Sequence, residues 1–315
     1  MNIKNFFRLI RWPNLLMIIL SQFLLQYLLI AHVFELVQME SPLTSVQFIL
    51  LVLSTVLMAA FGYTYNDVQD VYVDSINKGT HRIIDLHISK KNGKKISWIL
   101  LLLSLIPALY LSIELHMIQL ILIHLFIALG LWHYSNKLKQ KALGGNILIS
   151  IFTAFSIYIV WLYHLVALKN NAVLIVDGRT VIPFINKLVI AYSLFAFIIS
   201  LIRELVKDVQ DMQGDASRNM KTFVIRFGIH HTKILIQLLC FIMLAMTLAA
   251  AYYSYSYHWY QLSIYFLVAV GIPLVYFSFS LKKSQNTQDF TNLSSLAKIV
   301  MLAGILSMQI FYITY

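Results

Sequence analysis

Long uncharged runs of leucine, isoleucine and other apolar residues recur along the chain, separated by short polar segments. A helix that crosses a bilayer needs about 20 such residues. The runs are continuous and do not alternate with polar residues, which favours helices over a transmembrane β-barrel. The pattern therefore predicts nine membrane-spanning helices, at residues 15–33, 46–64, 97–113, 117–134, 143–168, 185–202, 234–253, 259–280 and 293–313.

The composition excludes several classes of protein. Of the 315 residues, 60% are apolar and 12% are charged, whereas a soluble domain has about 45–50% and about 25%. The mean hydropathy of +0.77 excludes soluble globular and disordered chains, and the single cysteine, Cys240, excludes a disulfide scaffold. We expect an all-α, polytopic membrane protein in which residues 1–315 form one integral-membrane domain.

The basic residues predict how the chain is oriented. With the N-terminus inside and nine spans, 21 of the 24 lysines and arginines fall in segments on the inner face. Cytoplasmic loops carry such an excess of Lys and Arg. We therefore expect a multi-pass protein of the cell (inner) membrane, with a cytoplasmic N-terminus and an extracytoplasmic C-terminus. This orientation accounts for the net charge of +11, so that no nucleic-acid partner is needed.

The acidic residues are few and are concentrated. Seven of the 13 follow the second and sixth predicted spans, namely Asp67, Asp70, Asp74, Glu204, Asp208, Asp211 and Asp215. The two segments repeat each other, because NDVQDVYVD at 66–74 matches KDVQDMQGD at 207–215 with an offset of 141 residues. Four spans separate them, so the repeat is parallel rather than inverted. We expect pseudo-repeated halves at about 1–142 and 143–292, followed by a ninth helix at 293–313.

The spacing i, i+3, i+7 would place three carboxylates within about 60° of arc on a continuous helix. Two such strips facing each other across a central cavity would repel strongly. Protonation would relieve that repulsion, as would divalent cations, and Mg²⁺ prefers one or two carboxylates together with phosphate oxygens and water. A solvated acidic loop, or acids paired with nearby lysines and arginines, is the structural alternative. A cation-coupled transporter is the functional alternative from another class.

Several motifs resemble those of the UbiA superfamily of intramembrane prenyltransferases. The paired acidic segments resemble its two aspartate-rich motifs. The tetrapeptide RWPN at 11–14, the segment YSNKLK at 134–139 followed by Gly145-Asn146, and IRELVKDVQDMQGD at 202–215 resemble further family motifs. The last of these is similar to members that make archaeal-type ether lipids and to chlorophyll synthases. One segment departs from the family, because RIIDLH at 82–87 replaces RPIPSG.

The resemblance implies a nine-helix bundle around a central cavity and Mg²⁺-dependent transfer of a polyprenyl group from its diphosphate to a lipophilic acceptor. It implies that Asp67, Asp70, Asp208 and Asp211 are catalytic. Two Mg²⁺ ions would be bound by Asn66, Asp67, Asp70, Asp74, Asp208, Asp211 and Asp215. The diphosphate would be held by Arg11, Arg82, Tyr134, Ser135, Lys137 and Lys207.

The expected reaction is geranylgeranyl transfer to a prenylated glycerol phosphate. An aromatic acceptor, as in quinone biosynthesis, is the nearest alternative. The active site is expected toward the cytoplasmic side. Aromatic side chains can stabilise the allylic cation, and Phe61, Tyr63, Tyr65 and Tyr134 are candidates at the right depth. Ordinary packing or interfacial aromatics are the alternative for each of them.

Overall fold

The computed structural model describes residues 2–77, 79, 82–169 and 172–315, which form helices and no β-strand. The chain begins with α1 (Ile3–Leu9) and then a long helix composed of α2 (Trp12–Leu24), the π-helical turn η1 (Leu25–Ile30) and α3 (Ala31–Leu36). The helices that follow are α4 (Ser45–Gln69), α5 (Val71–Asn77), α6 (Lys90–Glu114), α7 (Leu120–Asn136), the 3₁₀ turn η3 (Leu138–Gln140), α8 (Gly144–Lys169), α9 (Ala172–Asp177) and α10 (Val181–Gln210). The last are α11 (Met212–Ser217), α12 (Phe223–Ser256), α13 (Tyr260–Tyr265), the π-helical turn η4 (Phe266–Gly271), α14 (Ile272–Lys283) and α15 (Thr287–Thr314).

Each of the nine predicted apolar runs overlaps an apolar helical segment, and those at 117–134, 143–168 and 259–280 begin one to three residues before it. Within the described part of the chain, eight helices are long and apolar enough to cross a membrane. The run predicted at 117–134 corresponds to α7, which has 17 residues and is shorter than the others. The all-helical membrane fold is thus confirmed, whereas the count of nine spans stays a prediction.

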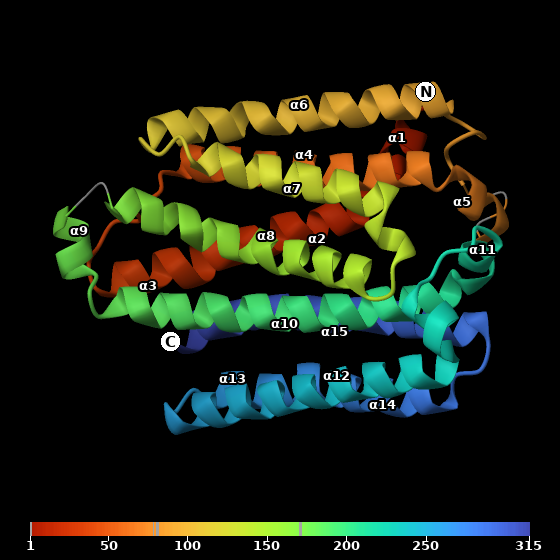
Figure 1. Cartoon of the computed structure of the whole chain (residues 1–315). Helices are drawn as coiled ribbons and strands as arrows, with labels where there is room; N and C mark the ends of the chain where they lie inside the picture. Colours follow the sequence, from red (N-terminus) through yellow and green to blue (C-terminus); the bar gives the residue numbers. More distant parts are fainter. Residues whose placement is uncertain (1, 78, 80–81, 170–171) are drawn as a thin grey trace.

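Local sequence fixes where two of the long helices begin. Thr44 and Gln47 form a capping box at the start of α4, in which each side chain accepts a hydrogen bond from the other's backbone N–H, over 3.3 and 3.0 Å. Asn286 and Asp289 form the same arrangement at the start of α15. Such boxes satisfy donors that a helix N-terminus leaves unpaired. Both helices therefore begin at defined positions, α15 at the end of the bundle that carries the acidic motifs and α4 at the opposite end (Figure 1).

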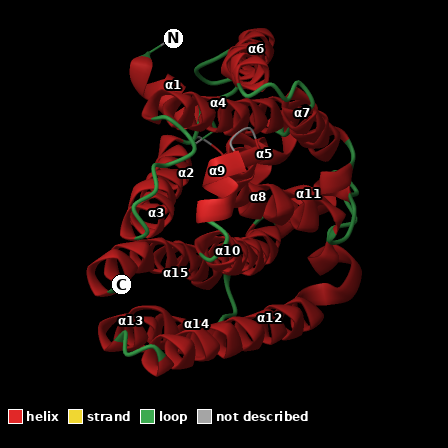
Figure 2. Cartoon of the chain, turned by 90° about the vertical axis from the view of Figure 1, so that its left-hand side faces the viewer, coloured by secondary structure: helices red, strands yellow, loops and turns green. Residues whose placement is uncertain are grey.

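Six helices form a ring, and the remaining long helices pack outside it. Neighbours in the ring are α2, α4, α7, α8, α10 and α15, with α15 in turn contacting α2 (Figures 1 and 2). Outside the ring, α6 packs against α4, and α12 and α14 pack against α10 and α15. Buried apolar side chains fill the contacts between the ring and these outer helices. The ring leaves a cavity at its centre.

The two acidic segments lie at one end of the bundle. The short helices α5 and α11 follow α4 and α10 and pack against each other, at the end that also carries the N-terminus (Figure 1). The C-terminus lies at the opposite end. This arrangement agrees with termini on opposite faces of a membrane. Which face is cytoplasmic stays a prediction.

The expectation of one continuous helix through each acidic motif is wrong. The helix α4 ends before Asp70, whose φ and ψ are −91° and 10°, and α10 ends before Asp211, at −89° and 1°. Both values fall in the sparsely populated region between helix and strand, where many active-site residues sit. Each chain then turns into a new short helix, α5 or α11. The first aspartate of each motif therefore lies before a bend and the third lies after it.

Candidate active site

A largely apolar cavity of about 450 Å³, here called the deep cavity, lies inside the ring. Side chains from all six ring helices line it. Its polar groups include Asn66, Tyr134, Glu204 and Lys207, which stand near the acidic motifs. Farther along α8 and α15 the walls become apolar, with residues such as Ile157. The cavity therefore offers a charged end and an apolar interior, as a prenyl diphosphate requires.

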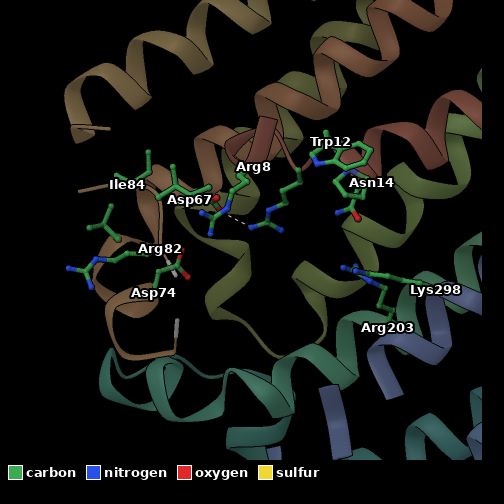
Figure 3. A pocket seen from close by; sticks show the side chains of 13 residues that line it. Arg8, Trp12, Asn14, Asp67, Asp74, Arg82, Ile84, Arg203 and Lys298 are labelled. Carbon is green, nitrogen blue, oxygen red and sulfur yellow. Dashed lines mark hydrogen bonds and ion pairs between the residues drawn. The ribbon is translucent and has the colours of Figure 1, made fainter. Parts of the chain in front are cut away.

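A second cavity of about 380 Å³, here called the basic cavity, adjoins the first (Figure 3). Five cationic side chains and two acidic ones line it, namely Arg8, Arg11, Arg82, Arg203, Lys298, Asp67 and Asp74. In Figure 3, Arg203 and Lys298 lie on one side, Arg82 and Asp74 lie on the other, and Arg8 and Asp67 lie between them. The two cavities share five residues, Arg11, Pro13, Asn14, Arg203 and Lys298. These shared residues form a neck between the cavities.

The first acidic motif is held by two cations. Arg11 Nη2 lies 2.5 Å from Asp67 Oδ1, and the guanidinium also stands over the Tyr63 ring at 5.2 Å. The ammonium of Lys139 pairs with Asp70, which also accepts a hydrogen bond of 2.7 Å from the amide of Asn66. Burial alone would lower the pKa of Arg11 and of Lys139, but the carboxylates of Asp67 and Asp70 raise both pKa values above their ordinary range. Both cations therefore stay charged.

The second acidic motif is less fully paired. The amide of Asn146 donates a 2.9 Å hydrogen bond to Asp208 Oδ2. Asp215 is 1% exposed, and burial raises its pKa to about 6. Asp211 is half-buried at the bend between α10 and α11. Beside the motif, Arg203 pairs with Glu204 at 2.7 Å.

The two motifs are tied together through their backbones. Asn77, which follows the first motif, donates to the Asp211 carbonyl at 3.1 Å and accepts from the Gly214 N–H at 2.9 Å. Arg218, which follows the second motif, donates to the Gln69 carbonyl at 3.2 Å. The short helices α5 and α11 are thereby fixed side by side.

The oxygen-rich motifs fit a magnesium site that is completed by substrate. Among the described residues, no three His, Cys, Asp or Glu side chains come together closely enough to hold a metal ion. Mg²⁺ needs only one or two carboxylates when phosphate oxygens and water supply the remaining ligands. Two buried oxygens of the motifs, Asn66 Oδ1 and Asp215 Oδ1, lack a hydrogen-bond partner among the described residues. Such acceptors are costly when unpaired, and a cation would satisfy them.

Comparison with known proteins decides the family. A family model described as the UbiA prenyltransferase family matches residues 27–301. The chain belongs to this family. The family predicted from the motifs is therefore confirmed, and with it the prediction of a prenyltransferase.

The UbiA-family relatives are similar over most of their length. The chain is 25% identical over 303 residues to a digeranylgeranylglyceryl phosphate synthase of Sulfurisphaera tokodaii, covering 96% of this chain and 98% of that protein. It is 29% identical over 253 residues to the enzyme of the same name from Korarchaeum cryptofilum, covering 80% of each. A solved structure of digeranylgeranylglyceryl phosphate synthase has a TM-score of 0.59 and 25% identity, covering 97% of this chain and 98% of the other.

A UbiA homolog from Archaeoglobus fulgidus bound to GPP and Mg²⁺ shares the fold. Its TM-score is 0.53 at 18% identity, and the match covers 97% of this chain and 99% of that chain. At this identity the likeness concerns the fold. In that fold, a prenyl diphosphate and a metal ion are accommodated together.

Within this UbiA-family fold, the residues expected at the diphosphate fall into two groups. Arg11, Tyr134 and Lys207 line the deep cavity, and Arg82 lines the basic cavity. Ser135 is buried, and its hydroxyl donates to the Leu131 carbonyl within its own helix at 3.1 Å. Lys137 is exposed and lines neither cavity.

The predicted aromatic residues divide in the same way. Tyr63 and Tyr134 line the deep cavity. Phe61 and Tyr65 instead pack against Trp98 of α6, with ring centroids 6.0 and 6.1 Å away. Only the first two are therefore placed beside a bound prenyl group.

Four residues near the site were not chosen from the sequence as ligands. Lys139 pairs with Asp70, Asn146 bonds to Asp208, and Arg203 and Lys298 line both cavities. Lys139 and Asn146 lie in motifs that carried the family resemblance, so a signal for them was present. Arg203 also lies in such a motif, at 202–215, whereas Lys298 stands alone among apolar residues and the pattern gave it no role.

The segment that departs from the family forms an ordered turn. Ile84 and Ile88 are buried against Leu9 and Val68. Between them Asp85 adopts a φ of 73°, and its N–H donates to the Ile88 carbonyl at 2.9 Å. Asp85 itself is exposed. The turn thus anchors Arg82 at the basic cavity without the prolines and glycine of the family pattern.

Proposed function

We propose that the chain transfers a geranylgeranyl group from its diphosphate to the hydroxyl of a prenylated glycerol phosphate. The observation that carries the proposal is the deep cavity, whose charged end meets both aspartate motifs and whose interior is apolar. The relatives named digeranylgeranylglyceryl phosphate synthase, which match over most of their length, support this choice of acceptor.

The charged end of the deep cavity is suited to the leaving diphosphate. Lys207 and Tyr134 line this end, and Lys139 lies beside it on Asp70. Their cationic and hydroxyl groups are positioned where negative charge develops when the allylic C–O bond breaks, which is the effect that most lowers such barriers. The prenyl chain occupies the apolar interior, where water is excluded from the allylic cation.

We propose that the two motifs hold magnesium together with the diphosphate. The ligands would come from Asn66, Asp67, Asp70, Asp74, Asp208, Asp211 and Asp215, in two sets that correspond to the two motifs. When bound, the metal neutralises charge on the leaving group as a Lewis acid. Asn146 orients Asp208, and such supporting partners are worth about 10–100-fold in metal affinity.

We propose an active site that faces the cytoplasm of a cell membrane, with the N-terminus on the same side. The excess of lysine and arginine in the segments at that end supports this orientation. The acidic motifs and the N-terminus lie at one end of the bundle and the C-terminus at the other (Figure 1).

The decisive experiment is transfer by purified protein reconstituted in lipid. Geranylgeranyl diphosphate is supplied with Mg²⁺ and with either geranylgeranylglycerol phosphate or an aromatic acceptor, and product is measured by mass spectrometry. We expect product only when the acceptor is geranylgeranylglycerol phosphate, and none with the aromatic acceptor. EDTA should abolish it and added Mg²⁺ should restore it.

The matched variants are Asp67→Ala and Asp208→Ala, with Asp177→Ala as the control because it lies in α9, at the end of the bundle away from both motifs (Figure 1). The two motif variants should give no product, and the control should behave as the wild type. Transfer that persists in EDTA or in both motif variants would disprove the metal site. Transfer to the aromatic acceptor alone would disprove the proposed acceptor.

A further inference from the structure

We propose that Lys298 and Arg203, at the neck between the two cavities, bind the phosphate of the acceptor and thereby select a phosphorylated glycerol lipid. The inference rests on the proposed function and assigns a recognition site to it. It starts from the basic cavity, whose charge is not explained by the acidic motifs beside it.

The basic cavity carries more positive charge than its own carboxylates balance. Five cationic side chains face two acidic ones, Asp67 and Asp74. Among the described residues, Lys298 has neither a hydrogen bond nor an ion pair. Arg203 pairs with Glu204 through one Nη atom, and a guanidinium has five N–H donors. Both side chains therefore have donors available for an anion.

Lys298 lies on a different part of the ring from Lys139 and Asn146, although Arg11 and Lys207 line the deep cavity with it. Lys139 and Asn146, which hold Asp70 and Asp208, come from the segment after α7 and from the start of α8. Lys298 lies on α15, which packs between α10 and α2 on the other side of the ring (Figure 2). The cations of the site thus come from two regions of the ring, one on α10 and α15 and the other around the start of α8. A reaction between two phosphorylated lipids can use both.

The neck places the two regions next to each other. Arg11, Arg203 and Lys298 line both cavities. Figure 3 shows Arg203 and Lys298 together on one side of the basic cavity, with Arg8 and Asp67 across from them. A phosphate held there keeps the glycerol hydroxyl at the mouth of the deep cavity, where the allylic carbon is exposed to attack. Holding two reactants in this way is itself a large part of catalysis.

The surroundings of Lys298 fit an acceptor that is a lipid. Ile299 and Leu302 line the deep cavity and are 56% and 37% exposed. Trp12, across the neck on α2, lines the basic cavity and is 46% exposed. Apolar surface next to a basic neck suits a ligand with a prenyl tail and an anionic head.

The test compares an acceptor with and without its phosphate. Steady-state transfer from geranylgeranyl diphosphate is measured with geranylgeranylglycerol phosphate and with geranylgeranylglycerol. The variants are Lys298→Met and Arg203→Met, and the control is Lys283→Met, an exposed lysine at the end of α14 that lines neither cavity.

We expect Lys298→Met to lower kcat/KM for the phosphorylated acceptor by about tenfold or more, the value of a hydrogen bond to a charged group. The unphosphorylated acceptor and the KM for the donor should change by less than about threefold, within the range of an ordinary surface substitution. Arg203→Met should act in the same direction, and Lys283→Met should match the wild type. Lys298→Arg keeps the positive charge and should therefore retain most of the preference for the phosphorylated acceptor.

Inorganic phosphate separates a lipid headgroup from a free ion. In the wild type it should compete with the acceptor, and it should lose potency in Lys298→Met. Inhibition that is non-competitive with the acceptor, with an unchanged acceptor KM in the variant, would assign the neck to a free ion and overturn the inference. If the variant raised only the KM for the donor, the neck would be assigned to the donor diphosphate, and the inference would again be overturned. Wild-type protein inactive with both acceptors would instead refute the proposed function.

Discussion

Asn77 and Arg218 occupy equivalent positions 141 residues apart, and each donates a hydrogen bond to the backbone of the other acidic motif. Asn77 reaches the carbonyl of Asp211, and Arg218 reaches the carbonyl of Gln69. The offset is the one that relates the two motifs in sequence. The reciprocal contacts therefore support a parallel repeat, and they fix the distance between the two sets of carboxylates.

This relationship predicts that Asn77 controls metal affinity without touching metal. Asn77→Ala removes two hydrogen bonds between α5 and α11, so the Mg²⁺ concentration for half-maximal activity should rise by about tenfold. Gly214→Ala should have the same effect, because an added Cβ would lie 2.5 Å from Asn77 Nδ2 and displace it. Activity is titrated with Mg²⁺ in both variants. Ser217→Ala, which removes only a local bond to the Gly214 carbonyl, is the control. An unchanged Mg²⁺ dependence in Asn77→Ala would contradict the role.

Substitutions of Lys139 and of Lys137 should affect activity very differently. The sequence alone did not distinguish the two lysines. Lys139 pairs with Asp70, which is 2% exposed, whereas Lys137 is exposed. Lys139→Met should lower kcat by at least about 100-fold, as the loss of a group that stabilises the leaving charge does. Lys137→Met should stay within about threefold of the wild type, as surface substitutions usually do. Single-turnover transfer measures both. Equal losses would show that Lys137 also reaches the diphosphate.

Lys137 and Lys139 illustrate which features of the site the sequence could not predict. Apolar runs fix the helices because lipid offers the backbone no other partners, and the acidic motifs identified the end of the bundle that carries the site. The bends at Asp70 and Asp211 were missed because the helical spacing of the aspartates continues through both. Lys139 was missed because α7 ends at Asn136 and a 3₁₀ turn follows. Two lysines separated by one residue then point in directions that no periodicity predicts.

Lys298 was missed for a different reason. A lone lysine in an apolar helix looks like an interfacial anchor, whose long side chain extends to the membrane surface. Only the packing of α15 against α10 and α2 places it at the neck. Such groups are found when helices that are distant in sequence are brought together.

Arg11 combines an ion pair with a strained backbone. It has a φ of 54°, a left-handed conformation that costs a residue other than glycine about 1–2 kcal/mol. Arg11→Gly removes that strain but also the pair with Asp67, which is buried, and removing one partner of a buried pair costs about 3–5 kcal/mol. The loss exceeds the relief of strain, so the melting temperature should fall by about 5 °C. Activity should fall much further, by at least about 100-fold. Thermal unfolding and transfer assays on the same sample separate these effects, with Arg11→Lys as the variant that keeps the charge. Retained activity in Arg11→Gly would show that the guanidinium is dispensable.

Gly304 sets the width of the deep cavity part-way along its apolar interior. A Cβ at Gly304 would lie 2.5 Å from Cε1 of Phe195, and both residues line the cavity. Gly304 is six residues beyond Lys298 on α15, or about 9 Å along the helix axis. Gly304→Ala therefore pushes the Phe195 ring into the path of a long prenyl chain, while a short chain ends before it.

We expect Gly304→Ala to lower kcat/KM for geranylgeranyl diphosphate by about tenfold, the effect of moderate overpacking, and to leave geranyl diphosphate nearly unaffected. Phe195→Leu added to Gly304→Ala should restore the long substrate, because the smaller side chain makes room for the new methyl group. Gly271→Ala is the matched control, since the nearest neighbour of its Cβ among the described residues would be the Phe266 carbonyl, at 3.5 Å. Equal losses with both diphosphates, or no rescue by the second substitution, would show that the prenyl chain does not pass between α10 and α15.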